Sequence, residues 1–293
     1  MSAQVEGQWG LHEARAWARA RLDEAGVDSV DADVRELLEW ACDVTTQWDL
    51  PTVLDPEQAE KLRGGVAERA LRIPLQHVTG RMFFRSLVLT AMPGVFIVRP
   101  ETEVLAGLAI DEARSVVGTR GEARVVDLCT GSGAIALAVA TEAARTEVWA
   151  VEKEPDPFAL ACHNRDRIGA RGVHLERGDA TNLATLHFLN GLVDVGVTNP
   201  PYVPADEMPT QPEASADPQS ALYGGSEDGL DIPARIIRRA LTLLRPGGLL
   251  LMEHSPSQDE ALRAYATSVG MVDAATEADL TGRMRFLRAR TPR

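Results

Sequence analysis

The sequence Asp127-Leu128-Cys129-Thr130-Gly131-Ser132-Gly133 begins at the end of an apolar stretch, residues 124–128, and leads into an alanine-rich stretch, residues 134–144. The apolar stretch is typical of a buried strand and the alanine-rich stretch of a helix. Glycines between them allow a sharp turn and let a ligand approach the N-terminus of the helix. This order predicts a cofactor-binding α/β fold. Residues 131–136 also match the looser dinucleotide fingerprint, so the turn alone leaves the cofactor open.

Further strands and helices alternate after this turn. We predict helices at 156–168 and 232–244, a turn at 246–248, and strands at 147–151, 173–176, 193–197, 249–253, 271–276 and 284–289. Alternation of this kind is typical of a doubly wound, mainly parallel α/β sheet. Ligands of such sheets bind at the carboxyl ends of the strands, so we expect the functional residues there.

The residues before the turn have a different pattern. Between residues 10 and 72, apolar side chains recur at helical spacing, and Gly26 ends the first run. Asp31 is expected to cap a second helix, and Asp55-Pro56-Glu57-Gln58 has the form of a capping box at the start of a third. Four tryptophans lie in this helical region, and they are expected in its core or, as the alternative, on a surface that contacts a partner: Trp9, Trp17, Trp40 and Trp48.

The expected domain division follows from these changes of pattern. Pro74 stops the third helix near Ile73, and residues 82–98 predict a short hairpin with Pro93-Gly94 as a turn. Another helix opens within residues 99–103 and runs to about residue 117. We therefore expect a separable helical domain at 1–75 that recognises a protein substrate, a hairpin linker at 76–98 and an α/β domain at 99–293.

The composition restricts the class of protein. The 293-residue chain is 45% apolar, enough for a normal core, and its formal charge of −13 gives no overall attraction for nucleic acid. Its three cysteines are far apart and fit no zinc spacing, so we expect neither a metal site nor a disulfide framework. We find no apolar signal core and no apolar run of membrane length. The expected location is the cytoplasm, without membrane contact.

The tetrapeptide Asn199-Pro200-Pro201-Tyr202 follows the predicted strand at 193–197. Amide and aromatic amine nitrogens are poor nucleophiles, because their lone pairs are delocalised. The side-chain carbonyl of Asn199 and the backbone carbonyl of Pro200 can each accept one N–H and aim the lone pair at a methyl donor. Both prolines stiffen the loop, and Tyr202 can stack on the flat amide. The tetrapeptide therefore predicts methyl transfer to such a nitrogen, driven by positioning and electrostatics.

Two acidic residues follow neighbouring predicted strands. Glu152 ends the strand at 147–151, where an acid accepts hydrogen bonds from both hydroxyls of a ribose. This position suits the adenosine of a nicotinamide dinucleotide or of S-adenosylmethionine, and the tetrapeptide favours the second. Asp179 follows the strand at 173–176 and either bonds an adenine amino group or is an ordinary loop aspartate.

Taken together, these segments resemble the release-factor glutamine methyltransferases, the HemK/PrmC family, nearly from end to end. The resemblance rests on residues 74–80, 93–103, 127–135, 198–202, 224–231 and 279–283. Arg99-Pro100-Glu101-Thr102-Glu103 followed at this distance by the tetrapeptide is highly specific. The resemblance implies an N-terminal helical bundle, a β-hairpin linker and a seven-stranded, class I Rossmann-like methyltransferase domain that depends on S-adenosylmethionine.

The activity that the resemblance implies is methylation of the glutamine side-chain amide in the Gly-Gly-Gln motif of bacterial class-1 peptide release factors. The residues that would grip this glutamine are Asn199, Pro200, Pro201 and Tyr202. The residues that would hold the cofactor are Cys129, Thr130, Gly131, Ser132, Gly133, Glu152, Asp179, Ala180 and Asn199. Three positions depart from the family pattern: Cys129 replaces a common glycine, Val98 a common proline, and Ala180 an aromatic residue of some members.

Other functions stay open from the sequence alone. DNA adenine methylation uses a similar tetrapeptide but needs a basic surface, which the charge of −13 disfavours. Glutamine methylation of a ribosomal protein differs only in the substrate. A non-catalytic scaffold that binds S-adenosylmethionine would be expected to have lost Asn199 or Gly131, and a nicotinamide dehydrogenase would need a hydride-transfer site. Residues 204–228, with four prolines, are expected to form either a surface loop near the substrate or a disordered insertion.

Overall fold

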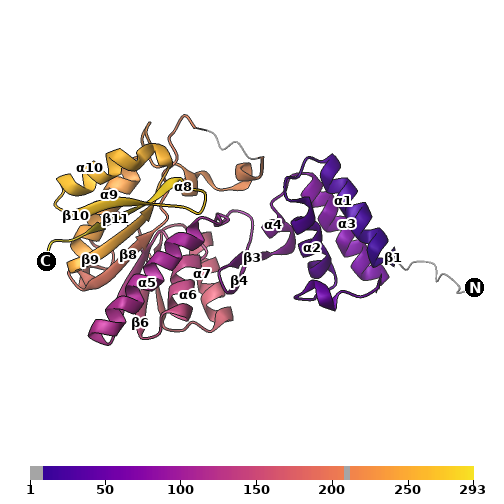
Figure 1. Ribbon diagram of the computed structural model, residues 1–293, viewed down its shortest axis with the longest axis horizontal. Helices are drawn as coiled ribbons and strands as arrows, with labels where there is room; N and C mark the ends of the chain where they lie inside the picture. The colour runs from indigo at the N-terminus through magenta and orange to yellow at the C-terminus, as the bar shows by residue number, and fades with distance from the viewer. Residues whose placement is uncertain (1–8, 208–211) are drawn as a thin grey trace, which may run out of the picture. The chain divides into compact units, whose positions relative to one another are not determined.

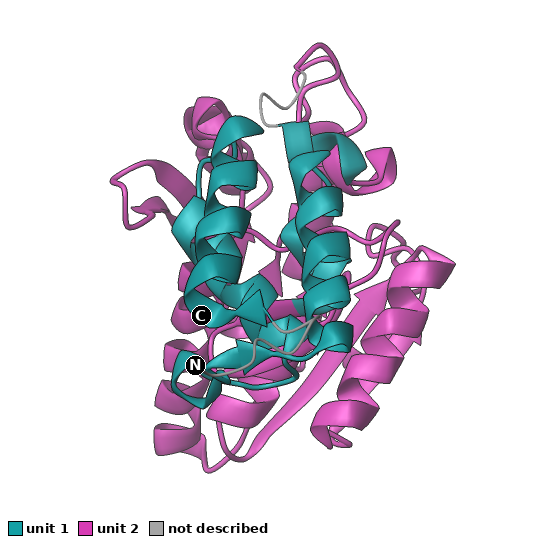
Figure 2. Cartoon of the chain, turned by 90° about the vertical axis from the view of Figure 1, so that its right-hand side faces the viewer, with its two compact units in different colours: residues 1–81, 210–216 teal, residues 82–209, 217–293 magenta. Residues whose placement is uncertain are grey.

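The computed structural model describes residues 9–207 and 212–293, which belong to two compact units (Figure 2). Unit 1 contains residues 1–81 and 210–216, and unit 2 contains residues 82–209 and 217–293. Residues 1–8 of the expected domain 1–75, and residues 208–211 of the expected loop 204–228, lie outside the described residues.

Unit 1 is built from helices around one apolar core. Its secondary structure includes α1 (Leu11–Glu24), α2 (Val30–Ala41), η1 (Gln47–Asp49), α3 (Pro56–Ala70), α4 (Leu75–Thr79), and β1 (Trp9–Gly10) paired with β2 (Val53–Leu54). Leu22, Leu37 and Leu62 are fully buried in the core. The capping box is confirmed, because Asp55 accepts the Gln58 N–H at 2.8 Å and Gln58 accepts the Asp55 N–H at 3.0 Å.

Two predictions for this unit are wrong. Asp31 does not cap α2, which begins at Val30 with Ser29 at the N-cap position. The helix starts earlier because the Ser29 hydroxyl donates to Asp33 at 2.6 Å and Asp33 pairs with buried Arg69 at 2.7 Å. Trp48 lies in η1, a short turn that packs none of its residues into the core, and its side chain is 86% exposed. The other three tryptophans are partly buried against the core.

The hairpin is confirmed, with its turn at a different place. β3 (Arg81–Phe84) pairs with β4 (Leu87–Thr90) across a turn at residues 85–86. A two-residue turn lets Phe84 and Leu89 both face the interior, where they are buried. Pro93-Gly94 instead forms a separate turn, in which the Val95 N–H donates to the Met92 carbonyl at 3.3 Å.

Unit 2 contains a seven-stranded sheet in the order β10-β11-β9-β8-β5-β6-β7. The strands from β9 to β7 are parallel, and β11 is antiparallel to both of its neighbours. The predicted mainly parallel α/β sheet is therefore confirmed. The strands are β5 (Ala123–Leu128), β6 (Thr146–Glu152), β7 (Val173–Arg177), β8 (Val193–Thr198), β9 (Leu244–Glu253), β10 (Val272–Ala278) and β11 (Met284–Arg290).

Helices cover both faces of this sheet (Figure 1). Alternate strand residues such as Val125 and Val195 pack with α5 and α6, while Val126 and Leu250 pack with α9 and α10 on the opposite face. The helices of unit 2 are α5 (Thr102–Arg120), α6 (Ala134–Glu142), α7 (Pro155–Ile168), α8 (Gln219–Leu222), α9 (Asp231–Leu243) and α10 (Asp259–Ser268), with 3-10 turns η2 (His187–Leu189) and η4 (Pro256–Gln258). A further 3-10 turn, η3 (Pro212–Ala216), belongs to unit 1.

Residues 246–248, predicted as a turn, lie inside β9. The pairing of β8 with β9 shifts between Val193↔Leu244 and Val195↔Leu249. The additional β9 residues form a bulge, and Gly247 takes a φ of +76° that suits glycine. The strand therefore continues to Glu253 at the carboxyl edge of the sheet.

The strand order creates a switch point at the carboxyl edge. The chain adds β6 and β7 on one side of β5, and β8 and β9 on the other. The turn after β5 and the tetrapeptide after β8 therefore lie next to each other, where ligands of such sheets bind.

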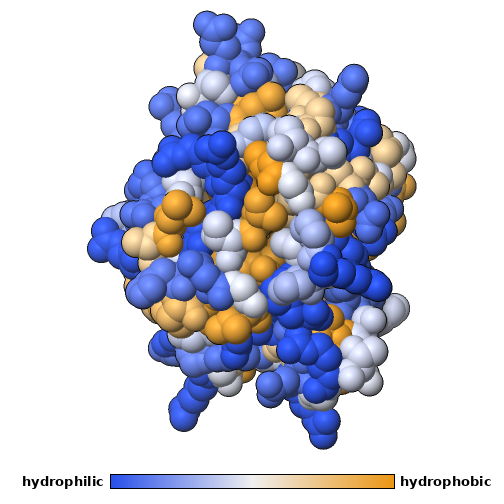
Figure 3. Space-filling model, turned by 90° about the vertical axis from the view of Figure 1, so that its left-hand side faces the viewer, coloured by the Kyte–Doolittle hydropathy of each residue, from blue (hydrophilic) through white to orange (hydrophobic). Residues whose placement is uncertain are grey.

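The described surface is mainly polar where Figure 3 presents it. Apolar side chains gather there in narrow bands between polar ones, an arrangement that needs no partner to explain it. Within residues 9–207 and 212–293, no helix is both long and apolar enough to span a bilayer.

Candidate active site

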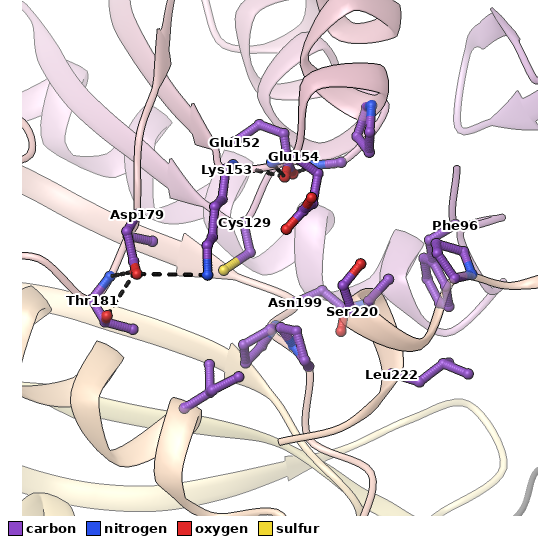
Figure 4. A pocket seen from close by; sticks show the side chains of 18 of the residues that line it. Phe96, Cys129, Glu152, Lys153, Glu154, Asp179, Thr181, Asn199, Ser220 and Leu222 are labelled. Atoms are coloured by element: carbon purple, nitrogen blue, oxygen red, sulfur yellow. Dashed lines mark hydrogen bonds and ion pairs between the residues drawn. The ribbon is translucent and has the colours of Figure 1, made fainter. Parts of the chain in front are cut away.

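A cavity of about 320 Å³ lies in unit 2 at the carboxyl edge of the parallel strands (Figure 4). Its wall combines the ends of β5, β6 and β7, the tetrapeptide after β8, and residues 218–223. Nine residues predicted from sequence line it: Cys129, Gly131, Glu152, Asp179, Ala180, Asn199, Pro200, Pro201 and Tyr202. Thr130, Ser132 and Gly133 belong to the turn but are not part of the cavity wall.

The turn after β5 is held by a buried carboxylate. Asp127 is fully buried and accepts hydrogen bonds from the Thr130 hydroxyl at 2.6 Å and from the Ala136 N–H at 3.1 Å. Burial raises the pKa of Asp127 to about 7. These bonds join the turn to the first residues of α6, and so explain why Thr130 shapes the cavity without lining it.

Cys129 occupies a backbone conformation that favours glycine. Its φ is +66°, in the left-handed region also taken by Gly131 and Gly133. Burial raises the pKa of the Cys129 thiol far above its usual range, so the group stays protonated. Cys129 therefore presents a small uncharged side chain to the cavity at a conformational cost that glycine would avoid.

Glu152 connects the ends of β5 and β6. One carboxylate oxygen accepts the Gly131 N–H at 2.9 Å, and the other accepts the N–H groups of Lys153 at 2.7 Å and Glu154 at 2.8 Å. Burial raises the pKa of Glu152. An ionised carboxylate has about four acceptor positions, so three backbone bonds leave capacity for a ligand hydroxyl.

Asp179 and Lys153 face each other across one end of the cavity (Figure 4). The Lys153 ammonium lies 3.9 Å from the Asp179 carboxylate, which also accepts the N–H and hydroxyl of Thr181 at 2.8 and 2.6 Å. Burial alone would raise the pKa of Asp179, but the bonds from Thr181 and the Lys153 charge hold it below its usual value. The aspartate is therefore a fixed, charged acceptor beside the small side chain of Ala180.

The tetrapeptide is anchored by two residues that sequence reasoning did not assign to the site. Asn199 Nδ2 donates to the Thr102 hydroxyl at 3.2 Å, and this hydroxyl donates to Glu253 at 2.7 Å. The Tyr202 hydroxyl donates to the other oxygen of Glu253 at 3.1 Å. Thr102 begins α5 and Glu253 ends β9, so the segment 99–103 and the tetrapeptide meet in one hydrogen-bonded group.

Leu222, Gly229 and Gln258 contact the backbone of the tetrapeptide and Val203. The N–H groups of Tyr202 and Val203 donate to the Leu222 carbonyl at 3.0 and 2.8 Å. Gln258 donates to the Tyr202 carbonyl at 2.7 Å. A Cβ at Gly229, where φ is +70°, would lie 2.3 Å from that same carbonyl oxygen. The close approach therefore requires glycine at position 229.

The loop 204–228 contributes directly to the site. Residues 218 and 220–223 line the cavity, together with Phe96. Asp217 fixes the start of this stretch by accepting the Ile97 N–H at 3.3 Å and by pairing with Arg99. The expectation that the loop lies near the ligand site agrees with these contacts for the residues that the structure describes.

Family models match both parts of the chain. Residues 13–80 match a PrmC N-terminal domain, and residues 120–282 match a methyltransferase domain. The solved structure of a methyltransferase from Pyrococcus furiosus covers 71% of this chain and 91% of its own, with a TM-score of 0.52 and 17% identity. At this identity the likeness shows the methyltransferase fold.

Three curated relatives that match over nearly their whole length are named release factor glutamine methyltransferase. The protein of Streptomyces coelicolor is 45% identical, over 94% of this chain and 96% of its own length. That of Bifidobacterium longum is 44% identical, over 92% and 96%, and that of Deinococcus radiodurans is 36% identical, over 96% and 98%. This chain therefore belongs to the release factor glutamine methyltransferase family.

Proposed function

We propose that the chain is an enzyme that methylates the side-chain amide nitrogen of the glutamine in the Gly-Gly-Gln motif of a bacterial class-1 peptide release factor, with S-adenosylmethionine as donor. The observation that carries this proposal is the held amide of Asn199. Its NH₂ group donates a hydrogen bond to the Thr102 hydroxyl at 3.2 Å, which leaves the carbonyl to accept a substrate N–H. The printed names of the relatives support release factors as the acceptor.

The lining of the cavity fits S-adenosylmethionine. Glu152 retains acceptor capacity for a ribose hydroxyl, and Asp179 and Ala180 would flank the adenine. Cys129 and Gly131 would contact the methionine part, with Thr130, Ser132 and Gly133 shaping the turn. When bound, the cofactor supplies a methyl group on a sulfonium, whose leaving group is a neutral thioether.

The tetrapeptide would orient the acceptor amide. The Asn199 side-chain carbonyl and the Pro200 backbone carbonyl each take one N–H, which turns the nitrogen lone pair toward the methyl group. Pro200 and Pro201 hold these carbonyls in place, and the Tyr202 ring packs against the flat amide. The methylated nitrogen is acidic enough to lose its extra proton to water. Catalysis therefore rests on orientation, with no strong base.

The N-terminal helical unit, expected at 1–75, would recognise the protein substrate. Its exposed apolar side chains include Trp48 at 86% and Leu71 at 77% exposure. Tryptophan is enriched among the residues that contribute most to binding at protein–protein interfaces. We expect Trp48→Ala to raise the KM for release factor and to leave the KM for the cofactor unchanged. Equal KM values for release factor in the variant and the native chain would refute a role of Trp48 in recognition.

The acceptor is tested by transfer of tritiated methyl groups from S-adenosylmethionine. The substrates are a class-1 release factor, the same factor with Gln→Ala in its Gly-Gly-Gln motif, ribosomal proteins and duplex DNA. The proposal predicts label in the native release factor alone. Label in DNA, or in a ribosomal protein but not in release factor, would overturn it.

A further inference from the structure

Glu253 is a buried carboxylate without a direct ion pair in the described structure. It is fully buried at the end of β9, and its two oxygens accept hydrogen bonds from the hydroxyls of Thr102 and Tyr202, at 2.7 and 3.1 Å. Arg285, whose charge acts on it, pairs with Glu101 at 3.5 Å and Asp279 at 3.1 Å. Burial of a charge with only neutral donors is costly, so this arrangement calls for a role beyond stability.

The direction of the hydrogen bonds determines how Asn199 is turned. A threonine hydroxyl has a single proton, and Thr102 gives its proton to Glu253. Toward Asn199, the Thr102 oxygen can therefore only accept, and only the NH₂ half of the Asn199 amide can donate to it. Asn199 is one of the residues that line the cavity, and its carbonyl is left for the substrate.

We propose that Glu253 and Thr102 are positioning residues that lock the Asn199 amide with its carbonyl facing the acceptor, and so select a substrate that donates N–H over one that carries a carboxylate. This inference rests on the proposed function and deepens it. Without the lock, a half-turn of the amide would present its NH₂ group, which suits a carboxylate and repels an N–H donor. The Tyr202 hydroxyl, held by the same carboxylate, fixes the other end of the tetrapeptide.

The protonation of Glu253 controls this lock. Burial raises its pKa to about 7, the bonds from Thr102 and Tyr202 and the charge of Arg285 act against burial, and the charge of Glu101 adds to it. A protonated Glu253 can donate to Thr102, which frees the threonine proton for the Asn199 carbonyl and allows the half-turn. Ionised Glu253 is the productive form, so kcat falls as the pH drops through about 7. The titratable groups that act on Glu253 are Glu101, Tyr202 and Arg285. His254 follows Glu253 in the chain, and Asp279 pairs with Arg285.

The first experiment removes the Thr102 hydroxyl while keeping the side-chain shape. At saturating substrates, Thr102→Val should lower kcat by about 100-fold, as expected for a misplaced orienting group. The KM for S-adenosylmethionine should stay within about threefold, and Thr102→Ser should restore most of the rate. The matched control is Thr291→Val, because Thr291 is also buried and its hydroxyl donates to Arg245 at the opposite end of β9. A native kcat in Thr102→Val, or an equal loss in Thr291→Val, would overturn the proposal.

The second experiment measures selectivity, which a merely structural role would not change. Release factor with Gln→Glu in its Gly-Gly-Gln motif competes with the native factor, and the ratio of inhibition constant to native KM is compared between variants. In Thr102→Val this ratio should fall about tenfold, the scale of one hydrogen bond. An unchanged ratio would refute the lock.

The third experiment uses the native chain and Glu253→Gln, so its result does not depend on whether the Thr102 variants fold. The native chain should lose kcat as the pH falls from about 8.5 to 5.5 at saturating cofactor, and Glu253→Gln should show a flat profile with a lower maximum. A native profile that is flat, or one that Glu253→Gln preserves, would contradict the proposal. Failure of the native chain to methylate release factor at any pH would instead refute the proposed function.

Discussion

The proposed cofactor side and the proposed acceptor side of the cavity are built differently. On the cofactor side, Glu152 accepts hydrogen bonds from backbone N–H groups, whose residues are separated from it by 1, 2 and 21 positions in the sequence. On the acceptor side, the hydrogen bonds join side chains that are 51, 97 and 151 positions apart in the sequence. They connect Asn199, Tyr202, Thr102 and Glu253. Side-chain changes at remote positions should therefore disturb acceptor geometry and spare cofactor binding.

The largest expected effect is on the acceptor side. Asn199→Ala removes one of two acceptors for the substrate amide, and kcat should fall about 100- to 1000-fold, as for loss of one oxyanion-hole donor. Affinity for S-adenosylmethionine, measured by calorimetry, should change far less. Asn190→Ala is the control, because Asn190 is a loop asparagine near the opposite end of β8, bonded to Arg239. A variant at position 199 that lost cofactor affinity as steeply as rate would remove the distinction between the two sides.

The cofactor side should respond in the opposite way. Glu152→Ala removes the acceptor of three backbone N–H groups and of the proposed bond to a ribose hydroxyl. Binding of S-adenosylmethionine should weaken by about 2–3 kcal/mol, or about 30- to 150-fold in Kd. At saturating cofactor, kcat should stay within about tenfold of native. Native affinity of Glu152→Ala for S-adenosylmethionine in calorimetry would contradict the assignment of this cavity as the cofactor site. Binding of NADH in place of S-adenosylmethionine would contradict it as well.

A smaller effect should come from Gly229, which lies against the backbone of the tetrapeptide. Gly229→Ala places a Cβ 2.3 Å from the Tyr202 carbonyl oxygen, so the tetrapeptide must shift, and kcat should fall about tenfold. Gly191→Ala is a matched control, since Gly191 has nearly the same φ, +71°, and nothing within 4 Å of the added Cβ. Both variants lose stability from the left-handed φ, about 1–2 kcal/mol, but only Gly229→Ala should lose rate. Equal rates in the two would show that this contact does not matter for catalysis.

The smallest effect should be a gain in stability. Cys129 has a φ of +66°, and Cys129→Gly should raise the free energy of unfolding by about 0.5–1 kcal/mol, after allowance for the flexibility of glycine in the unfolded chain. Cys129→Ala keeps a Cβ in the strained conformation and should give no gain. Chemical denaturation of the three proteins checks this. If alanine stabilised as much as glycine, strain at position 129 would not be the cause.

Most of the fold was predictable because burial leaves a direct mark on the sequence. The inner strands β5 and β8 are almost wholly buried, and their predicted bounds lie within a few residues of the structure, as for 193–197 against Val193–Thr198. The bulge in β9 was not predictable, since Pro246-Gly247-Gly248 has the composition of a turn and only pairing with β8 keeps it in the strand. The five-residue helix α4 is too short for a periodic pattern.

Residues of the candidate site were predictable where they lie at the ends of strands. Glu152 follows a predicted strand and lines the cavity. Glu253 ends the strand predicted at 249–253 and so carries the same sequence signal. Thr102 could not be found in this way, because its role depends on the start of α5 meeting a strand end 151 positions later.

The central claim is that one methyl group reaches the side-chain nitrogen of the Gly-Gly-Gln glutamine. Purified release factor is incubated with this chain and S-adenosylmethionine, digested, and sequenced by tandem mass spectrometry. The expected result is a single added methyl on that glutamine, absent with Asn199→Ala enzyme under the same conditions and absent from the Gln→Ala factor. A methyl on any other residue, or label that persists in the Gln→Ala factor, would contradict it.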